Sequence, residues 1–331
     1  MADRPFTFRS GDRELRGTLA LPVGHVAKPA PAPRGAGFEP AMPSVAQVAR
    51  PAERAGGASG RAVGLPPCVL LLHGFGSHDD DTGAYARLAD RLAAAGIASL
   101  RFSFSGSKPY ANHGTIRPAS EWVFDAIAAL RAVEQTGEVD ADHLGLLGLS
   151  TGGGVVVQVG ALCPQVRCVL ALSPVADGYQ WLRHRWITVH GEAAWEAFVA
   201  RAAADARRVA VGEPSEVVEH GYVQAMPDMA VWNATLERYP GLLREMALAS
   251  VADTFLFRPL TYVAELAPRP FLVVHGDADE SVPLTQAYDY FGRAGAGRGI
   301  RIIPGAPHCC WDTPFEGPLL DLCVEWLQEH L

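Results

Sequence analysis

The sequence contains no long apolar run. A transmembrane helix needs about 20 consecutive, mostly apolar residues, and no stretch approaches this length. The first ten residues, MADRPFTFRS, carry charges at Asp3, Arg4 and Arg9 and have no apolar core, so they do not resemble a secretory signal peptide. We therefore expect a cytoplasmic protein without a membrane partner.

Long runs of basic residues are also missing. Proteins that bind nucleic acid usually show a patch or stripe of lysine and arginine. Here 28 lysine and arginine residues are outnumbered by 36 aspartate and glutamate residues, which gives a formal net charge of −8. This acidic balance mostly favours solubility. We expect no nucleic-acid partner, and the sequence is equally compatible with a monomer and a homodimer.

The six cysteines lack the paired spacing of a zinc site, because none belongs to a Cys-x-x-Cys motif. Several lie inside apolar runs, as expected for buried, reduced thiols in a cytosolic protein. The acidic segment SHDDD at 77–81 has the residue types of a metal site, but a solvated loop before a helix is the favoured interpretation. We expect neither a metal nor a cofactor.

Short apolar runs alternate with longer amphipathic segments through much of the chain. The patterns predict strands at 68–74, 97–104, 143–149, 167–174, 270–276 and 299–305. They predict helices at 83–96, 120–137, 152–162, 284–294 and 315–330. Strands that alternate with helices indicate a mostly parallel, doubly wound α/β sheet covered on both faces.

Three segments fall outside this alternation. Residues 1–21 read as a β-hairpin around the turn GDR, and residues 22–66 as a flexible insertion rich in proline, glycine and alanine. Residues 175–260 have largely helical patterns and contain four of the seven tryptophans, which predicts a helical lid. The catalytic core would then comprise residues 67–174 and 261–331.

Chemically active side chains follow four of the predicted strands. The first strand ends in HGFG at 73–76, and the third in GLSTG around Ser150. The fifth ends in HGDADE at 275–280, and the sixth in PGAPH, which ends at His308. Open parallel sheets bind ligands beyond the carboxyl ends of their strands, so a serine, an acid and a histidine are expected at one edge.

These motifs resemble those of the α/β-hydrolase superfamily, whose nucleophile lies in G-x-S-x-G and precedes the acid and the histidine. The similar segments are LLLHGFG, LRFSFSG, LGLSTGG, RPFLVVHGDADESVP and PGAPHC. They are most similar to feruloyl and cinnamoyl esterases and to the dienelactone-hydrolase and prolyl-oligopeptidase-like groups. The resemblance covers residues 66–175 and 262–331 with the opening hairpin. Ser103 departs from it, because these families usually have aspartate there.

The resemblance implies a Ser-Asp-His catalytic triad. Ser150 would attack a carbonyl carbon and His308 would take its proton. Asp277, Asp279 and Glu280 compete as the acid, and the position of the acid in these families selects Asp279. The backbone N–H groups of Phe75 and Thr151 would form the oxyanion hole.

The predicted function is a serine hydrolase that cleaves carboxylic esters through an acyl-enzyme. The aromatic-rich lid favours an apolar or aromatic acyl group, with substrate contacts at Trp181, Trp186, Trp232 and Met226. Thioesterase, lactonase, carbon–carbon hydrolase, peptidase and acyltransferase activities use the same triad and remain alternatives. A non-catalytic ligand-binding protein on the same fold is a further alternative.

Other reactive side chains in these motifs have simpler interpretations. His73 and His275 each precede a glycine at the end of a strand, so both are interpreted as structural. Cys309 lies beside His308 but lacks the glycine-flanked turn that exposes a nucleophile.

Overall fold

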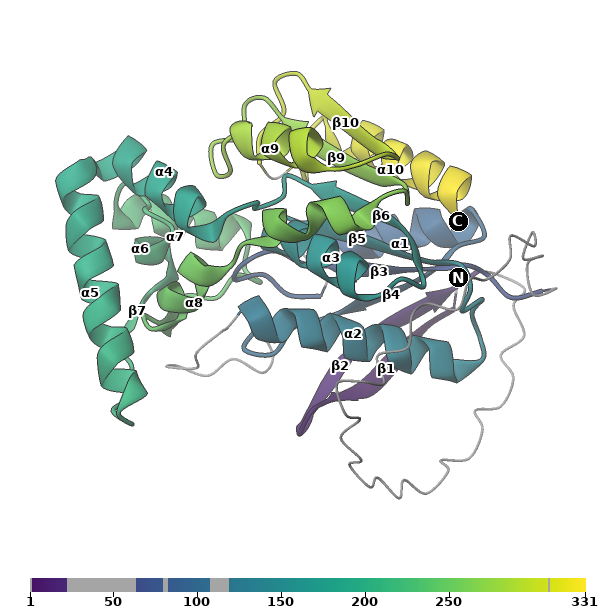
Figure 1. Ribbon diagram of the computed structural model, residues 1–331, viewed down its shortest axis with the longest axis horizontal. Coiled ribbons are helices and arrows are strands. Elements are labelled where there is room, and N and C mark those ends of the chain that lie inside the picture. Colours follow the sequence, from purple (N-terminus) through teal and green to yellow (C-terminus); the bar gives the residue numbers. More distant parts are fainter. Residues whose placement is uncertain (1, 23–63, 80–82, 108–118, 309) are drawn as a thin grey trace.

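The computed structural model describes residues 2–22, 64–79, 83–107, 119–308 and 310–331 (Figure 1). Most of the predicted flexible insertion at 22–66, the end of the 77–81 segment and Cys309 lie outside these residues. The described part is built around one central sheet with helices on both sides.

Eight strands form the central sheet in the order β1-β2-β4-β3-β5-β6-β9-β10. The hairpin of β1 (Ala2–Ser10) and β2 (Arg13–Leu21) is antiparallel, and β2 pairs antiparallel with β4. The other strands run parallel: β3 (Cys68–Leu72), β4 (Ala98–Phe102), β5 (Leu144–Leu149), β6 (Val166–Leu172), β9 (Phe271–Gly276) and β10 (Arg298–Ile303). The predicted mostly parallel α/β sheet is confirmed.

Helices cover both faces of the sheet, which explains the unbroken apolar runs of its central strands. Every residue of β5 is buried; Leu146 faces one helical layer and Leu147 the other. The first layer contains α2 (Ala119–Thr136), α3 (Thr151–Leu162) and α9 (Thr285–Arg293). The second layer contains α1 (Ala84–Ala94) and α10 (Glu316–His330).

The register of the parallel strands brings their carboxyl ends to one edge. Leu72 at the end of β3 is opposite Gly148, and Leu149 at the end of β5 is opposite Leu172. On the other side of β9, its last residue Gly276 is opposite Ile303 of β10. The loops that follow these strands therefore emerge together, as the positions of the motifs predicted.

A helical insertion, which we define as residues 178–256, lies between β6 and β9 at one end of the sheet (Figure 1). Its helices are α4 (Gly178–His190), α5 (Glu192–Ala210), α6 (His220–Val223), α7 (Met229–Arg238) and α8 (Ser250–Leu256). The sequence did not predict its two short strands, β7 (Val217–Glu219) and β8 (Glu245–Ala247). Three residues are too few for an alternating pattern to be visible. The 3₁₀ helix η2 (Pro259–Leu266) leads back to the core.

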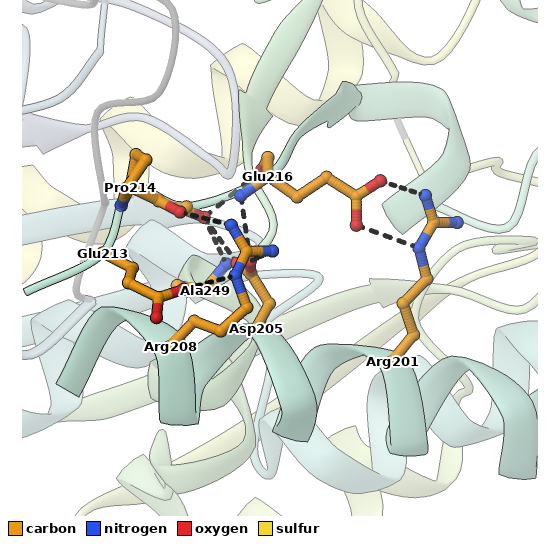
Figure 2. Close-up of polar contacts among 8 residues, drawn as sticks. Arg201, Asp205, Arg208, Glu213, Pro214, Glu216 and Ala249 are labelled. Atoms are coloured by element: carbon orange, nitrogen blue, oxygen red, sulfur yellow. Dashed lines mark hydrogen bonds and ion pairs between the residues drawn. The ribbon is translucent and has the colours of Figure 1, made fainter. Parts of the chain in front are cut away.

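A buried carboxylate on α5 holds the helical insertion together (Figure 2). The Asp205 side chain is 2% exposed and accepts hydrogen bonds from Ser215 Oγ at 2.6 Å and from the Glu216 N–H at 2.9 Å. Ser215 Oγ in turn accepts from the Ala249 N–H at 3.1 Å, next to α8. Arg201 forms a second link from α5 to the Glu216 carboxylate. These contacts tie α5 to both β7 and the start of α8.

Candidate active site

Ser150 occupies the turn between β5 and α3. Its backbone has φ 58° and ψ −118°, a conformation that residues other than glycine rarely adopt. The Ser150 N–H donates to the Leu172 carbonyl at 2.8 Å, and its carbonyl accepts from the Val175 N–H at 3.0 Å. These bonds join the turn to the end of β6 and hold the strained conformation in place.

Crowding around this turn explains its glycines. A Cβ atom on Gly148 would lie 2.3 Å from the carbonyl oxygen of Gly152. A Cβ atom on Gly152 would lie 2.3 Å from the carbonyl oxygen of Leu72 in β3. Gly154 would place a Cβ atom 2.6 Å from the Val175 carbonyl oxygen, so it allows α3 to approach the segment after β6. Any larger residue at these positions would displace the backbone.

The loop after β3 lies directly against Ser150. A Cβ atom on Gly74 would be 3.2 Å from the Cβ atom of Ser150. The buried ring of His73 holds this loop, because its Nε2 accepts from the Phe104 N–H at 3.1 Å and its Nδ1 donates to the Gly74 carbonyl at 2.8 Å. These two partners assign the Nδ1–H tautomer of His73. The predicted structural role of His73 agrees with these contacts.

Burial gives His73 a measurable effect on stability. It lowers the pKa of His73 from an ordinary value of 6.5 to about 4, although the hydrogen bond to Gly74 acts in the opposite direction. Between these values the unfolded chain binds a proton that the folded chain excludes. The free energy of unfolding should therefore fall by on the order of 3 kcal/mol as the pH drops from about 6.5 to 4.

Urea denaturation of the wild-type chain and the His73→Asn variant across this pH range measures the effect. The variant should show a shallower dependence of unfolding free energy on pH, whatever its stability at pH 7. His330→Asn, at the end of α10, controls for the loss of an imidazole elsewhere. Equal slopes in wild type and His73→Asn would contradict the prediction.

The two predicted oxyanion-hole residues belong to α3 and to the loop after β3, both of which adjoin Ser150. Thr151 is the first residue of α3, so its N–H has no acceptor within the helix. Phe75 follows Gly74 in the adjacent loop, and its ring packs against Trp181 and His220 with centroids 5.8 and 5.2 Å away. The ring contacts fix the loop from the side of the helical insertion.

The three acidic residues after β9 have different environments. Oδ2 of Asp279 lies 2.8 Å from Nδ1 of His308, and the Asp279 side chain is 1% exposed. Asp277 is exposed and accepts from the Gly305 N–H at 2.6 Å. Glu280 accepts from the His308 main-chain N–H at 3.3 Å. Of the three, Asp279 is the one that pairs with the imidazole ring.

A second histidine shares the Asp279 carboxylate. Nε2 of His275 lies 3.1 Å from Asp279 Oδ2 and 3.0 Å from the Val282 carbonyl oxygen. Because both partners are acceptors, this nitrogen carries the hydrogen. The N–H groups of Ser281 and Val282 donate to the other oxygen, Oδ1, each at 2.8 Å. The sequence motif did not reveal that His275 contacts the acid.

This environment keeps Asp279 ionised. Burial disfavours its charged form, but the charge of His308 and the hydrogen bonds from His275 and His308 outweigh burial and hold the pKa of Asp279 well below its usual range. A carboxylate at this position can orient the His308 ring and stabilise its protonated form.

One cavity of about 890 Å³ connects these residues with the helical insertion. Ser150, Phe75 and His308 contribute to its wall from the core. Three of the four predicted substrate contacts, Trp181, Trp232 and Met226, also line it. Residues of the core and of the helical insertion, which are far apart in the sequence, therefore line the same cavity.

Trp186, the fourth predicted substrate contact, does not line this cavity. Its ring stacks on Phe198 with centroids 4.3 Å apart, and its Nε1 donates to the Val223 carbonyl at 3.3 Å. The side chain faces α5 and packs inside the helical insertion, which corrects the prediction. Helical periodicity alone did not distinguish this face of α4 from the face that carries Trp181.

A family model described as Hydrolase_4, serine aminopeptidase S33, matches residues 66–313. The chain belongs to the serine aminopeptidase S33 family. The matched region contains Ser150, Asp279 and His308, and the helical insertion lies within it. The predicted resemblance to α/β hydrolases is confirmed, and with it the assignment to a hydrolase family.

The S33-family chain is similar to a monoacylglycerol lipase of Mycolicibacterium smegmatis, with 26% identity over 272 residues, 80% of this chain and 88% of that protein. Its fold is similar to the α/β hydrolase GrgF from Penicillium sp. sh18, with TM-score 0.72, 17% identity, and coverage of 100% and 99% of the two chains. It is also similar to Est1E from Butyrivibrio proteoclasticus with bound ferulic acid, with TM-score 0.59, 16% identity, and coverage of 98% and 96%. At these identities the two structures show a shared fold.

Polar residues of the insertion that the sequence did not single out also line the cavity of this S33-family protein. They include His184, Arg185, His220, Gln224 and Arg238. Each lies in a helix or next to one, where a polar residue normally indicates a solvated face. Their proximity to Ser150 depends on how the insertion folds back over the core, which a local pattern does not encode.

The described residues contain no group of three or more histidine, cysteine, aspartate or glutamate side chains arranged to hold a metal ion. In the described part of the 77–81 segment, Asp79 accepts from Ser103 Oγ at 3.1 Å and its N–H donates back to that oxygen at 3.1 Å. Ser103 therefore closes the loop at the position where it departs from the related families. No described helix is long and apolar enough to cross a membrane.

Proposed function

We propose that this chain is a serine hydrolase that cleaves carboxylic esters with an apolar or aromatic acyl group. The observation that carries the proposal is the 2.8 Å contact between the buried Asp279 and His308, because His308 lines the same cavity as Ser150. The strained backbone of Ser150 supports its assignment as the nucleophile, because such strain gathers at active sites.

The proposed reaction begins with attack by Ser150 Oγ on the carbonyl carbon. The Ser150 proton passes to Nε2 of His308, since Nδ1 is bound to Asp279. The carbonyl oxygen becomes an oxyanion, which the N–H groups of Phe75 and Thr151 stabilise. Collapse of this intermediate breaks the ester C–O bond, and His308 returns the proton to the leaving alcohol.

Water then completes the cycle. His308 takes a proton from the water, whose oxygen attacks the acyl carbon and forms a second oxyanion. Breakage of the bond to Ser150 releases the carboxylic acid, and the proton on His308 restores the serine hydroxyl. Asp279 stays ionised throughout and stabilises the imidazolium in both halves.

We further propose that the helical insertion serves as the lid of this cavity. Trp181 on α4 and Trp232 on α7 contribute large aromatic surfaces, with Met226 between these helices. Most ligand pockets combine such apolar surfaces with a few polar groups. These walls support an apolar or aromatic acyl group.

A substrate panel tests the proposed function. 4-Nitrophenyl esters with acyl chains of increasing length should be hydrolysed, and a fluorophosphonate should label the chain and stop turnover. Matched thioesters, lactones and anilides of the same acyl group distinguish the alternative activities of this triad. Binding without turnover across the whole panel would contradict the proposal and favour a ligand-binding protein.

A further inference from the structure

Arg185 has an unusual environment for a charged residue of the helical insertion. Its side chain lines the cavity that contains Ser150 and His308. Nε donates to the Gln224 carbonyl at 2.7 Å and Nη1 to the Glu280 carbonyl at 3.2 Å. Both acceptors are neutral main-chain oxygens.

Three other arginines of the insertion, Arg183, Arg201 and Arg208, are paired with carboxylates. Arg183, on the same helix, lies 2.9 Å from Glu192, and Arg201 is paired with Glu216. Within the described part of the chain, no carboxylate forms such an ion pair with Arg185. Burial lowers the pKa of Arg185, while the charges of Glu280 and Asp279 act in the opposite direction. An arginine remains protonated in proteins, so the cavity wall carries a positive charge.

The nearby carboxylates have other partners. Both oxygens of Asp279 accept hydrogen bonds, from two histidine rings and two main-chain N–H groups. Glu280 accepts from the main-chain N–H of His308. Among the described residues that line the cavity, Arg238 is the one further arginine and Glu280 the one carboxylate, so arginines exceed carboxylates in this part of the wall.

The two carbonyl contacts also orient the guanidinium. They use Nε and Nη1, and Nη2 donates to no other described residue. A planar guanidinium that is fixed at Nε and Nη1 presents its remaining N–H groups in a fixed direction, which suits a carboxylate. A neutral apolar ester would leave this charge desolvated and with only two neutral carbonyls as partners, which is unfavourable.

We propose that Arg185 binds a carboxylate group of the substrate, so that the substrates of this enzyme are esters that also carry a free carboxylate. This inference rests on the proposed esterase function and refines its substrate class. The carboxylate belongs either to the acyl part or to the leaving alcohol, and the recognition chemistry is the same in both cases.

Two matched substrate pairs test the proposal and distinguish these sources. The acyl pair is 4-nitrophenyl octanoate and the mono-4-nitrophenyl ester of octanedioic acid. The leaving-group pair is phenyl acetate and 4-carboxyphenyl acetate. For each pair, the ratio of kcat/KM for the carboxylate to kcat/KM for the neutral ester is measured in wild type, Arg185→Gln and Arg185→Lys.

Arg185→Gln should lower this ratio about 10- to 100-fold in one of the two pairs, mainly through KM, because a charge-assisted hydrogen bond is lost. Arg185→Lys should retain part of the ratio, since it keeps the charge but not the planar fork. Arg183→Gln, on the same helix but paired with Glu192, should match wild type.

An unchanged ratio in both pairs would overturn the proposal. This result includes an equal loss of kcat/KM for the charged and the neutral ester, which would indicate that Arg185 only supports the fold. Failure of the wild-type chain to hydrolyse any of the four esters would instead count against the proposed esterase function.

A binding measurement keeps the two failures separate. Calorimetric titration of Ser150→Ala with 4-carboxyphenyl acetate and with the octanedioic monoester measures recognition without turnover. Adding Arg185→Gln to this variant should weaken binding of at least one of them about tenfold or more. Equal affinities in the single and double variants for both ligands would refute the carboxylate site even if hydrolysis had failed.

Discussion

Ser150→Ala is expected to lower kcat for ester hydrolysis by about 10⁴–10⁶-fold, the range seen when a triad nucleophile is removed. The reason is chemical, because the neighbouring hydroxyl of Thr151 belongs to the first residue of α3 and lacks the strained backbone of Ser150. KM should change much less than kcat, since the hydroxyl contributes little to the cavity wall. Steady-state kinetics on a 4-nitrophenyl ester, together with fluorophosphonate labelling, measure both.

Ser10→Ala is a suitable control, because Ser10 ends β1 in the opening hairpin and does not line the cavity. It should label and turn over like the wild-type chain. Circular dichroism of both variants establishes that the fold is retained. Undiminished labelling of Ser150→Ala would show that another residue is the nucleophile.

The position of Ser150 was predictable because its constraints are local. Crowding at Gly148 and Gly152 arises within the turn and from the adjacent strand β3, so these glycines are visible in the sequence as a motif. The central strands were equally predictable, since burial on both faces leaves unbroken apolar runs such as that of β5.

The acid of the proposed triad was harder to predict from the sequence. Three carboxylates occur within four residues, and nothing local distinguishes Asp279 from Asp277 and Glu280. The resemblance to known families selected Asp279, whereas the structure gives a physical reason. The loop turns so that its Oδ1 meets the N–H groups of Ser281 and Val282, which directs Oδ2 toward His308.

The cavity wall opposite the core could not be predicted. Trp181 and Trp186 are five residues apart on one helix, yet one lines the cavity and the other stacks on Phe198. Arg185 lies between them and is held by carbonyls of Gln224 and Glu280, which are distant in sequence. Such contacts depend on the packing of the whole insertion and leave no periodic signal.

The contacts of Asp279 suggest that it has more than one function. It links a loop after β9 to His308, and it also binds His275, the fifth residue of the same strand. Strand β9 therefore positions the loop that follows it through the side chain of His275. This arrangement makes the orientation of the carboxylate depend on the rigid sheet, which favours a fixed geometry at His308.

Asp279→Asn is expected to lower kcat by about 10³–10⁴-fold while leaving the cavity intact. The main-chain N–H groups of Ser281 and Val282 would retain the amide oxygen, so the NH₂ group would face Nδ1 of His308. Nδ1 must then accept, which places the ring hydrogen on Nε2. In that tautomer His308 cannot take the proton of Ser150.

Asp277→Asn provides the matched control, because Asp277 lies two residues away, is exposed and contacts Gly305 rather than the imidazole. It should retain wild-type kcat within about twofold, as surface substitutions usually have small effects. Fluorophosphonate labelling of Asp279→Asn should be slowed in proportion to kcat but not abolished, because Ser150 is still present. If Asp277→Asn lost as much activity as Asp279→Asn, or if Asp279→Asn kept more than about a tenth of wild-type kcat, Asp279 would not be the acid that orients His308.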